Sequence, residues 1–576
     1  MAKLPGFIER HMGPEARENI IYRLQPLLRI HLYGKEDYGL AAGGDIGGLY
    51  LLVAIAVMIL AIACINFINL ATARASRRAR EIALRKSLGA YRSQLVGQFM
   101  GEALLFTALA LLVGLVLVLV GLPGFNDLSG GNYTLTWGIL ADILPALLAI
   151  GLVVGLAAGL YPAMYLSRFE PHQVLKGHAA PKQSGWLRRL LVILQLAATC
   201  LLLIGTGMVY RQIEFLHDKP LGFAAEHVVV LPIFARDRQS KSQDEQAPWL
   251  VERYTAVKES FLEHPNVLAA TAFRFLPGQT GGFVRLVKPE GHEGTQWRMP
   301  VQEADESFIA ALGVDLLAGR TFSPSNQRDR THSYILNEKA VRALGWTVAD
   351  AVGRRFGRAR SEEDAKGTVI GVVGDFHYAS LRQRVEPAAI GYRQWFYDYL
   401  GLRVHSGDLP ATIAFLQEQW QTFLPADYPF EYFFLDDSLA QAYRAEEQLA
   451  KMAAAFTGLA LFLAGLGLFG LASLSIAQRT REIGIRKALG ASVGGLFILL
   501  SKDSLKLVLL ANCIAWPVAY YGVERWLSTF SYHIPFAWEI YLGGGLATLL
   551  AALVTTSYQS IKAALARPMA ALGPAD

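Results

Sequence analysis

The stretch Arg80-Glu81-Ile82-Ala83-Leu84-Arg85-Lys86-Ser87-Leu88-Gly89-Ala90 decides how this sequence is interpreted, because it occurs twice. The second copy, about 400 residues later, reads Arg481-Glu482-Ile483-Gly484-Ile485-Arg486-Lys487-Ala488-Leu489-Gly490-Ala491. Seven positions are identical before the closing alanine, which also matches. Each copy follows a long apolar segment, so the repeat predicts two equivalent halves that each present one basic segment outside the bilayer.

The composition is that of a membrane protein. Of the 576 residues 53% are hydrophobic, the mean hydropathy is +0.30, and soluble domains contain about 45–50% apolar residues. Runs of roughly 18–28 apolar residues can cross a hydrocarbon core about 30 Å thick as helices. We predict seven such spans, at residues 49–72, 97–121, 137–165, 190–211, 449–475, 497–521 and 540–560.

The positions of basic residues predict the orientation. The short segments 73–96, 166–189 and 476–490 are rich in Lys and Arg, whereas the loops 122–136 and 522–539 are nearly free of them. The positive-inside rule therefore places the first three in the cytosol and the two loops outside. The chain has a net charge of +6, and its positive residues are concentrated in these segments beside the spans. This position favours membrane lipid as a partner and argues against nucleic-acid binding.

Residues 212–448 form a large polar segment that this orientation places outside. Runs rich in β-branched residues at 227–231 and 368–373 predict strands, and apolar spacing at 249–262 and 337–344 predicts helices. We expect a mixed α/β or α+β domain, which its length allows to split into two lobes. A helical pattern over 437–452 runs without a break into the span 449–475.

The two halves are unequal at their start. The second half has a span, a large outer domain and three further spans, whereas the first has a charged segment of 48 residues and three spans. We expect the chain to lack an initial span and most of a first outer domain. The alternative is a short native N-terminal segment that is translocated unaided. The fold class predicted is an α-helical membrane protein with seven transmembrane helices in two parallel repeats, plus a large mixed α/β extracytoplasmic domain.

With these features the chain resembles ABC-transporter permeases of the MacB/FtsX type. The resemblance rests on the duplicated basic motif, on Cys64-Ile65-Asn66-Phe67-Ile68-Asn69-Leu70 and on Ile370-Gly371-Val372-Val373-Gly374-Asp375-Phe376-His377. It covers nearly the whole chain and fits the duplicated, eight-span form, with the first span missing. By this resemblance the chain divides into a remnant of a first outer domain (1–48), a first FtsX-like unit (49–165), a cytosolic linker (166–189), a helix (190–211), a MacB-like outer domain (212–448) and a second FtsX-like unit (449–576).

The resemblance implies a permease that transmits force. A separate ABC ATPase, in two copies, would supply the ATP and Mg sites, dock on the cytosolic motif and move the spans. The outer domain would then push a substrate, or act on an extracytoplasmic adaptor or target protein. The implied location is the bacterial cytoplasmic membrane. The substrate is not implied, because macrolides, peptides, lipoproteins and control of a cell-wall hydrolase all fit such permeases.

The residues of the repeated motif have a chemistry that suits docking. An amphipathic helix with basic and apolar side chains can bind a groove on a partner. Glutamate four residues before arginine predicts a helical ion pair of about 0.2–0.5 kcal/mol, and the glycine fits a left-handed helix end. We therefore predict ATPase-coupling roles for Arg80, Glu81, Arg85, Lys86, Gly89, Arg481, Glu482, Arg486, Lys487 and Gly490. The alternative is an ordinary positively charged loop.

Other residues suggest packing more than chemistry. Gly151, Gly155 and Gly159 form a doubled GxxxG pattern that permits close helix approach, although glycine is also common in membrane helices. Asp375 and His377 follow a strand and fit a turn, since no third polar group is spaced to complete a catalytic or metal site. We therefore predict no catalytic residues and no metal ligands.

Three hypotheses for function remain. The chain has no P-loop sequence and its spans have few ionisable residues, which argues against an intrinsic ATPase and against an ion-driven pump. Asn66, Asn69 and Gln195 are the main polar residues in the spans, placed to bond between helices or to lie near an interface. We favour a permease subunit driven by a separate ATPase. The alternatives are a membrane-anchored sensor or binding module independent of ATP, and a membrane enzyme with its site in 212–448.

Overall fold

The computed structural model describes residues 26, 46–77, 79–167, 185–233, 248–278, 283–292, 297–359, 364–380, 383–392, 397–424, 429–478, 482–483, 485–486, 489 and 491–565. The chain forms two compact units. The membrane unit contains the chain up to Gly207, Gln448–Tyr520 and the chain from Trp538 onward. The outer unit contains Met208–Glu447 and also Tyr521–Ala537, a short segment that the sequence boundaries of 212 and 448 left out.

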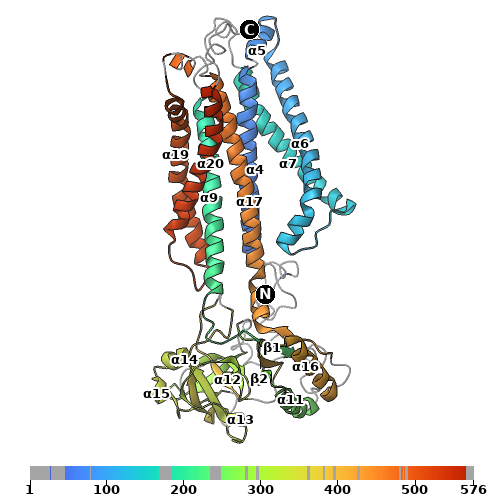
Figure 1. The fold of residues 1–576 in the computed structure, drawn as a ribbon, viewed down its shortest axis with the longest axis vertical. Coiled ribbons are helices and arrows are strands. Elements are labelled where there is room, and N and C mark those ends of the chain that lie inside the picture. The colour runs from blue at the N-terminus through green and yellow to red at the C-terminus, as the bar shows by residue number, and fades with distance from the viewer. Residues whose placement is uncertain are drawn as a thin grey trace, which may run out of the picture. The chain divides into compact units, whose positions relative to one another are not determined.

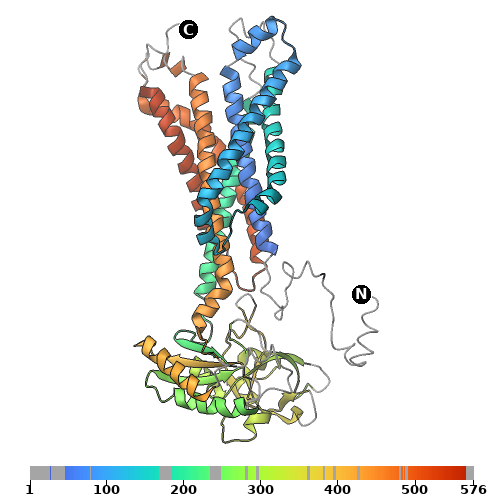
Figure 2. The same ribbon diagram turned by 90° about the vertical axis from the view of Figure 1, so that its right-hand side faces the viewer.

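Long helices make up the membrane unit, as Figure 1 and Figure 2 show. Their bounds are α4 Ile46–Arg77, α5 Ala79–Ser87, α6 Arg92–Ser129, α7 Trp137–Ser167, α9 Gly185–His217, α17 Leu435–Gln478, α19 Val493–Leu527 and α20 Trp538–Leu565. Helix α7 packs against both α6 and α4. Three of these helices, α9, α17 and α19, continue unbroken across the boundary between the units, as the pattern over 437–452 predicted for α17.

Each predicted span lies within one of these helices, but the count of seven is not confirmed. Six helices among the described residues are long and apolar enough to cross a membrane: α4, α6, α7, α9, α17 and α20. Helix α19 is of similar length but carries Lys502, Asp503 and Lys506. On the six helices many large apolar side chains are exposed, such as Leu117 and Val120 of α6. Such surfaces suit lipid, where a helix satisfies its own backbone hydrogen bonds.

The described residues of the outer unit form two sheets. The first has the order β11 (Phe433–Phe434), β1 (Val228–Pro232), β10 (Tyr399–Val404) and β2 (Val267–Phe273), with all neighbours antiparallel. Helices α11 (Pro248–Phe261) and α16 (Leu409–Phe423) pack on it through buried residues such as Phe261 and Trp420. The valines of β1 are fully buried, which explains why this run forms a central strand.

The second sheet is inserted in sequence between β2 and β10. Its order is β5 (Leu316–Gly319), β8 (Thr368–Val373), β6 (Ser333–Asn337), β9 (Ala389–Gly391), β4 (Trp297–Glu303), β3 (Phe283–Pro289) and β7 (Phe356–Arg358). Among the described strands of this sheet, the pairs β6–β8 and β4–β9 are parallel and the others antiparallel. The short helices are α12 (Phe308–Leu312), α13 (Asp329–His332), α14 (Glu338–Ala343) and α15 (Val348–Ala351), with a 3-10 turn at Asp364–Lys366. The predicted mixed α/β domain is confirmed, with one sheet in each lobe.

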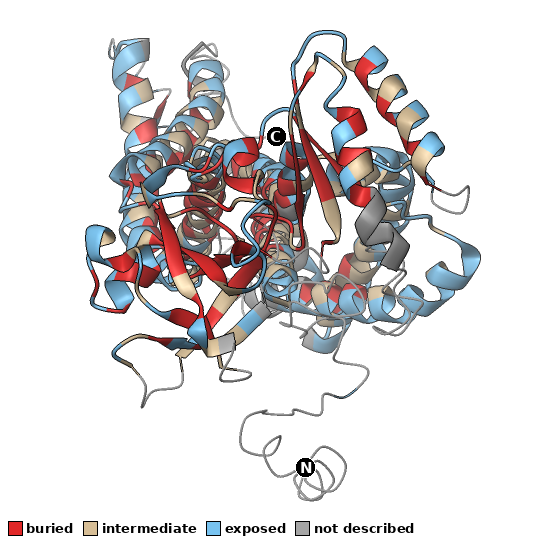
Figure 3. Ribbon diagram, turned by 90° about the horizontal axis from the view of Figure 1, so that it is seen from below, coloured by how far each residue is buried: buried red, intermediate tan, exposed pale blue. Residues whose placement is uncertain are grey.

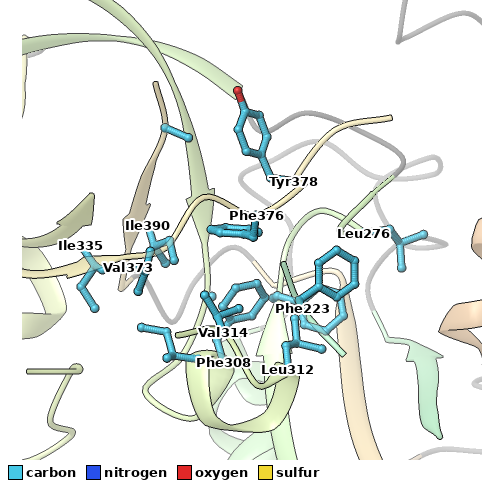
Figure 4. Packing of buried hydrophobic residues seen from close by; sticks show 14 of the residues in the cluster. Phe223, Leu276, Phe308, Leu312, Val314, Ile335, Val373, Phe376, Tyr378 and Ile390 are labelled. Carbon is cyan, nitrogen blue, oxygen red and sulfur yellow. The ribbon is translucent and has the colours of Figure 1, made fainter. Parts of the chain in front are cut away.

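A shared apolar core joins the two lobes. It contains Phe273 of the first sheet. Figure 4 shows Ile335 and Val373 of the second sheet in this core, together with Phe308 and Phe376. The ring of Phe308 lies 5.8 Å from that of Phe273 and 6.5 Å from that of Phe376. Viewed from below, the strands are mostly buried and the flanking helices are exposed on their outward sides (Figure 3). The lobes are therefore parts of one folded unit.

A buried ion pair fastens α11 to the loop before α12. The Lys258 ammonium lies 2.7 Å from the Asp305 carboxylate and 2.9 Å from that of Glu306. The Asp305 side chain is fully buried and also accepts hydrogen bonds from the Thr271 hydroxyl and the Ala272 N–H. Breaking a buried pair leaves an uncompensated charge, which costs far more than the net stabilisation from the intact pair.

We predict that Lys258→Met destabilises the chain by about 3–5 kcal/mol, because Asp305 stays buried without its cation. Arg342→Met is the control, since Arg342 pairs with Glu338 on the surface of α14 with 64% of its side chain exposed, and exposed helical pairs contribute only about 0.3–0.5 kcal/mol. Denaturant unfolding of the purified chain measures both. Equal losses for the two variants would show that the Asp305 site tolerates a missing cation.

Candidate functional site: two basic coupling segments and an outer contact at Tyr532

Residues 80–90, the first coupling segment, form α5 and its end. The Glu81 carboxylate lies 2.7 Å from the Arg85 guanidinium, which is the ion pair that the spacing predicted. Arg85 also donates to the Gln98 side-chain oxygen of α6 at 2.9 Å, so the segment is fastened to the next helix. At the helix end Gly89 adopts φ +95°, which favours glycine, and the Ala90 N–H donates to the Arg85 carbonyl.

Residues 481–491, the second coupling segment, repeat these interactions where the structure describes them. Glu482 pairs with Arg486 at 2.9 Å, and the Ala491 N–H donates to the Arg486 carbonyl. Ile483 is buried with Leu496 and holds the segment against its own unit. Arg481, Lys487 and Gly490 lie outside the described residues, and for Arg80 only the backbone, within α5, is described.

Both segments expose apolar side chains at matching positions. Leu88 is 88% exposed and Leu84 53%. Their counterparts Leu489 and Ile485 are 82% and 47% exposed. These residues lie outside the predicted spans, beside exposed arginines. A small apolar surface with a charged rim is the chemistry of a protein docking surface.

The three glycines at residues 151, 155 and 159 lie where α7 meets α6. A Cβ at Gly151 would lie 2.6 Å from the Leu111 side chain, and one at Gly159 would lie 2.8 Å from Ala103. At Gly155 the nearest atoms are those of Leu104 and Thr107. The stripe therefore allows two helices of the first repeat to approach more closely than larger residues would permit.

A contact that the sequence did not predict lies in the outer unit, at Tyr532 in the segment between α19 and α20. Gln212 is fully buried and uses both ends of its amide there. Its nitrogen donates to the Tyr532 carbonyl at 2.8 Å, and its oxygen accepts from the Ile534 N–H at 3.0 Å. The Tyr532 hydroxyl accepts from the Val385 N–H at 3.2 Å. Hence the end of α9, the segment 521–537 and the loop before β9 are held together.

The face of the Tyr532 ring carries two more contacts. The Lys219 ammonium lies 3.0 Å from the ring centroid, and the His377 ring meets Tyr532 edge-on at 5.4 Å. A cation over an aromatic face is attracted by the ring quadrupole. We call these residues, Gln212, Lys219, Val385, His377 and Tyr532, the Tyr532 contact. Only general cues in the sequence, a polar glutamine at a span end and a tyrosine in an outer loop, point to it.

Asp375 and His377 have structural partners. The Asp375 carboxylate accepts a hydrogen bond from the Lys339 N–H in the first turn of α14, where a negative group is favoured. The His377 N–H donates to the Leu221 carbonyl and its side chain is 5% exposed. Among the described residues no group of three His, Cys, Asp or Glu side chains is placed to hold a metal ion.

The His377 imidazole predicts a pH dependence. Burial, together with the Lys219 ammonium nearby, lowers its pKa to about 4, whereas an unfolded histidine has a pKa of about 6.5. The folded state therefore binds this proton less readily than the unfolded state. The stability that depends on a neutral His377 is complete above about pH 6.5 and is lost as the pH falls toward 4.

We predict that the wild-type chain loses about 1–2 kcal/mol more stability between pH 7 and pH 5 than His377→Gln does, because glutamine has no proton to gain. Thermal unfolding at the two pH values measures this difference. An unchanged response in His377→Gln would mean that His377 does not control this pH range.

Comparison with known proteins assigns the membrane helices to a known kind of permease domain. The model of the FtsX-like permease C-terminal family matches this chain twice, at residues 53–171 and 454–566. The chain carries two FtsX-like permease domains. They contain α4 to α7 in one case, and the span of α17 with α19 and α20 in the other. Each includes one coupling segment. With its apolar helices, the chain is a multi-pass inner-membrane protein with a large extracytoplasmic domain.

Two curated proteins with similar sequences are both ABC-transporter proteins. An uncharacterised ABC transporter permease, YknZ from Bacillus subtilis, is 30% identical over 20% of this chain and 29% of its own. The macrolide export ATP-binding/permease protein MacB from Chromobacterium violaceum is 26% identical over 44% of this chain and 42% of its own. The chain spans less than half the length of the curated relatives it matches.

Solved structures with some similarity are outer domains. The alignment with the periplasmic region of MacB from Actinobacillus actinomycetemcomitans covers 39% of this chain and 94% of that structure, at 12% identity and a TM-score of 0.28. The alignment with the extracellular domain of YknZ from Gram-positive bacteria covers 30% of this chain and 80% of that structure, at 13% identity and a TM-score of 0.22.

Proposed function

We propose that the chain is the permease subunit of an ATP-driven ABC transporter, and that it transmits the motion of a separate ATPase to its outer domain for export or mechanical signalling. The observation that carries the proposal is the duplicated coupling segment. Two equivalent docking surfaces suit two ATPase copies, which would bring ATP and Mg. The relatives are an ABC permease and a fused ATP-binding/permease protein, which supports the same assignment.

The coupling segments have the physical means to respond to a partner. In the first, the Glu81–Arg85 pair and the Arg85–Gln98 bond link the exposed residues Leu84 and Leu88 to α6. In the second, buried Ile483 links the segment to the residues packed around it. A partner that moved either segment would therefore move helices of the membrane unit, because tightly packed helices shift as rigid bodies.

Three connections could carry such movement outward. Helices α9 and α17 each continue without interruption from the membrane unit into the outer unit. The third is the segment 521–537, which contains the end of α19 and the residues leading to α20 and takes part in the Tyr532 contact. Through this contact, movement of α19 and α20 would reach the loop before β9. A membrane-anchored sensor without ATP would have no use for two coupling segments.

We predict that charge reversal in both segments, Arg85→Glu with Lys86→Glu and Arg486→Glu with Lys487→Glu, releases the ATPase. The new acidic side chains would face an ATPase surface that is complementary to cations. The amount of ATPase that co-purifies should therefore fall at least tenfold. The matched control reverses the exposed arginines Arg342 and Arg355 of the outer unit, which are 64% and 70% exposed. A partner that stays bound to the four-residue variant would contradict the docking role.

We predict that Tyr532→Ala uncouples the permease. It removes the ring under Lys219 and the acceptor of the Val385 N–H, while leaving the coupling segments untouched. ATPase binding should be unchanged, and ATP-dependent protease protection of the outer unit should disappear. Tyr521→Ala, at a side chain that is 66% exposed, should behave as wild type. Loss of ATPase binding in Tyr532→Ala would mean that the variant is misfolded and not uncoupled.

A further inference from the structure

The internal repeat gives each position of α4 a counterpart in α17. A shift of 401 residues brings Arg80 onto Arg481. The two family matches begin at residues 53 and 454 and so show the same shift. It extends without a gap through Leu70-Ala71-Thr72 and Leu471-Ala472-Ser473. The counterpart of Asn66 is therefore Gly467, and the counterpart of Ile62 is Leu463.

These counterparts meet in the membrane unit. The Asn66 side-chain nitrogen donates to the Leu463 carbonyl at 2.6 Å. A Cβ at Gly467 would lie only 2.1 Å from the Asn66 side-chain oxygen. Ile62, Leu463 and Ala460 belong to one apolar cluster from both helices. The asparagine of the first repeat thus occupies the space that the glycine of the second repeat leaves free.

The amide of Asn66 is an unusual group for this position. Asn66 is 7% exposed, and its side-chain oxygen accepts no hydrogen bond from the residues that the structure describes. Gln195 of α9, 1% exposed, directs its nitrogen to the same Leu463 carbonyl at 3.4 Å. An incompletely bonded amide among buried apolar side chains lowers stability. In paired helices a buried asparagine is the best-known device for selecting a partner at the expense of stability.

The asymmetry of the pair decides which helices fit. Two first repeats facing each other would place Asn66 against Asn66, with no glycine to receive either side chain. Two second repeats would place Gly467 against Gly467, and each Leu463 carbonyl would lose its amide donor from the facing helix. Only the mixed pair provides both the space and the donor. Selectivity of this kind rests on penalties against wrong pairs.

We infer that Asn66 and Gly467 form a one-way pairing element, by which the first repeat recognises the second repeat of the same chain. It excludes a second copy of the chain from this interface. The core around α4 and α17 is then completed within one polypeptide. This inference concerns pairing alone and does not depend on the proposed function.

A mutant cycle tests the fit. Gly467→Ala should lower the thermal unfolding midpoint of the detergent-solubilised chain by several degrees, because its methyl meets the Asn66 amide. In an Asn66→Ala background the same change should lower the midpoint much less, since only the Gln195 amide, 2.7 Å from that Cβ, still lies in its way. Gly458→Ala is the control in the same helix, because a Cβ there has no neighbour within 4 Å. If Gly467→Ala expresses poorly, recovery of expression by adding Asn66→Ala gives the same information.

Cross-linking tests the partner. In a chain whose native cysteines are replaced (Cys64→Ala, Cys200→Ala and Cys513→Ala), the pair Ile62→Cys and Leu463→Cys should form a bond within one chain. The two halves should then stay joined after cleavage at a protease site inserted in the linker 168–184. Ile62→Cys alone should give no cross-linked dimer. A dimer through that single cysteine, or an equal effect of Gly467→Ala with and without Asn66, would overturn the inference.

Discussion

The membrane unit depends on one main-chain carbonyl, that of Leu463. Side-chain amides of Asn66 from α4 and Gln195 from α9 both point to it, and three helices therefore meet at one point of α17. Glycine at 467 is the condition for this meeting, since any Cβ there would collide with the Asn66 amide. Lipid gives helices no hydrophobic reason to associate, so close packing and polar contacts of this kind must hold them together.

The outer unit uses a glutamine in a related way. Gln212 lies at the end of α9, fully buried, and satisfies both ends of its amide on the backbone of residues 532 and 534. Helix α9 therefore carries one buried glutamine in each unit, Gln195 and Gln212. Each contacts main chain far away in sequence. The continuous helix and the added segment 521–537 make the outer unit more than an insertion between two spans.

Much of the architecture was predictable from local patterns. Long apolar runs became helices, and the valine-rich runs at 228–232 and 368–373 became central strands, because burial and residue shape act over a few neighbours. The Glu–Arg ion pairs followed from helical spacing. The predicted span 497–521 is not confirmed as a membrane span, because the charges within α19 weaken its apolar signal. Asp375 and His377 have the structural contacts of a turn, but the tyrosine that packs on His377 was not foreseen.

The sequence by itself determined the repeat, the orientation given by basic segments, the kinds of element and the mixed basic and apolar composition of residues 80–90 and 481–491. Only the tertiary structure decided that Asn66 faces Gly467 and that Tyr532 belongs to the outer unit. The physical reason is range. Helix, strand and charge bias arise from residues close in the chain, whereas a fitted contact between residues hundreds of positions apart depends on how completed helices pack.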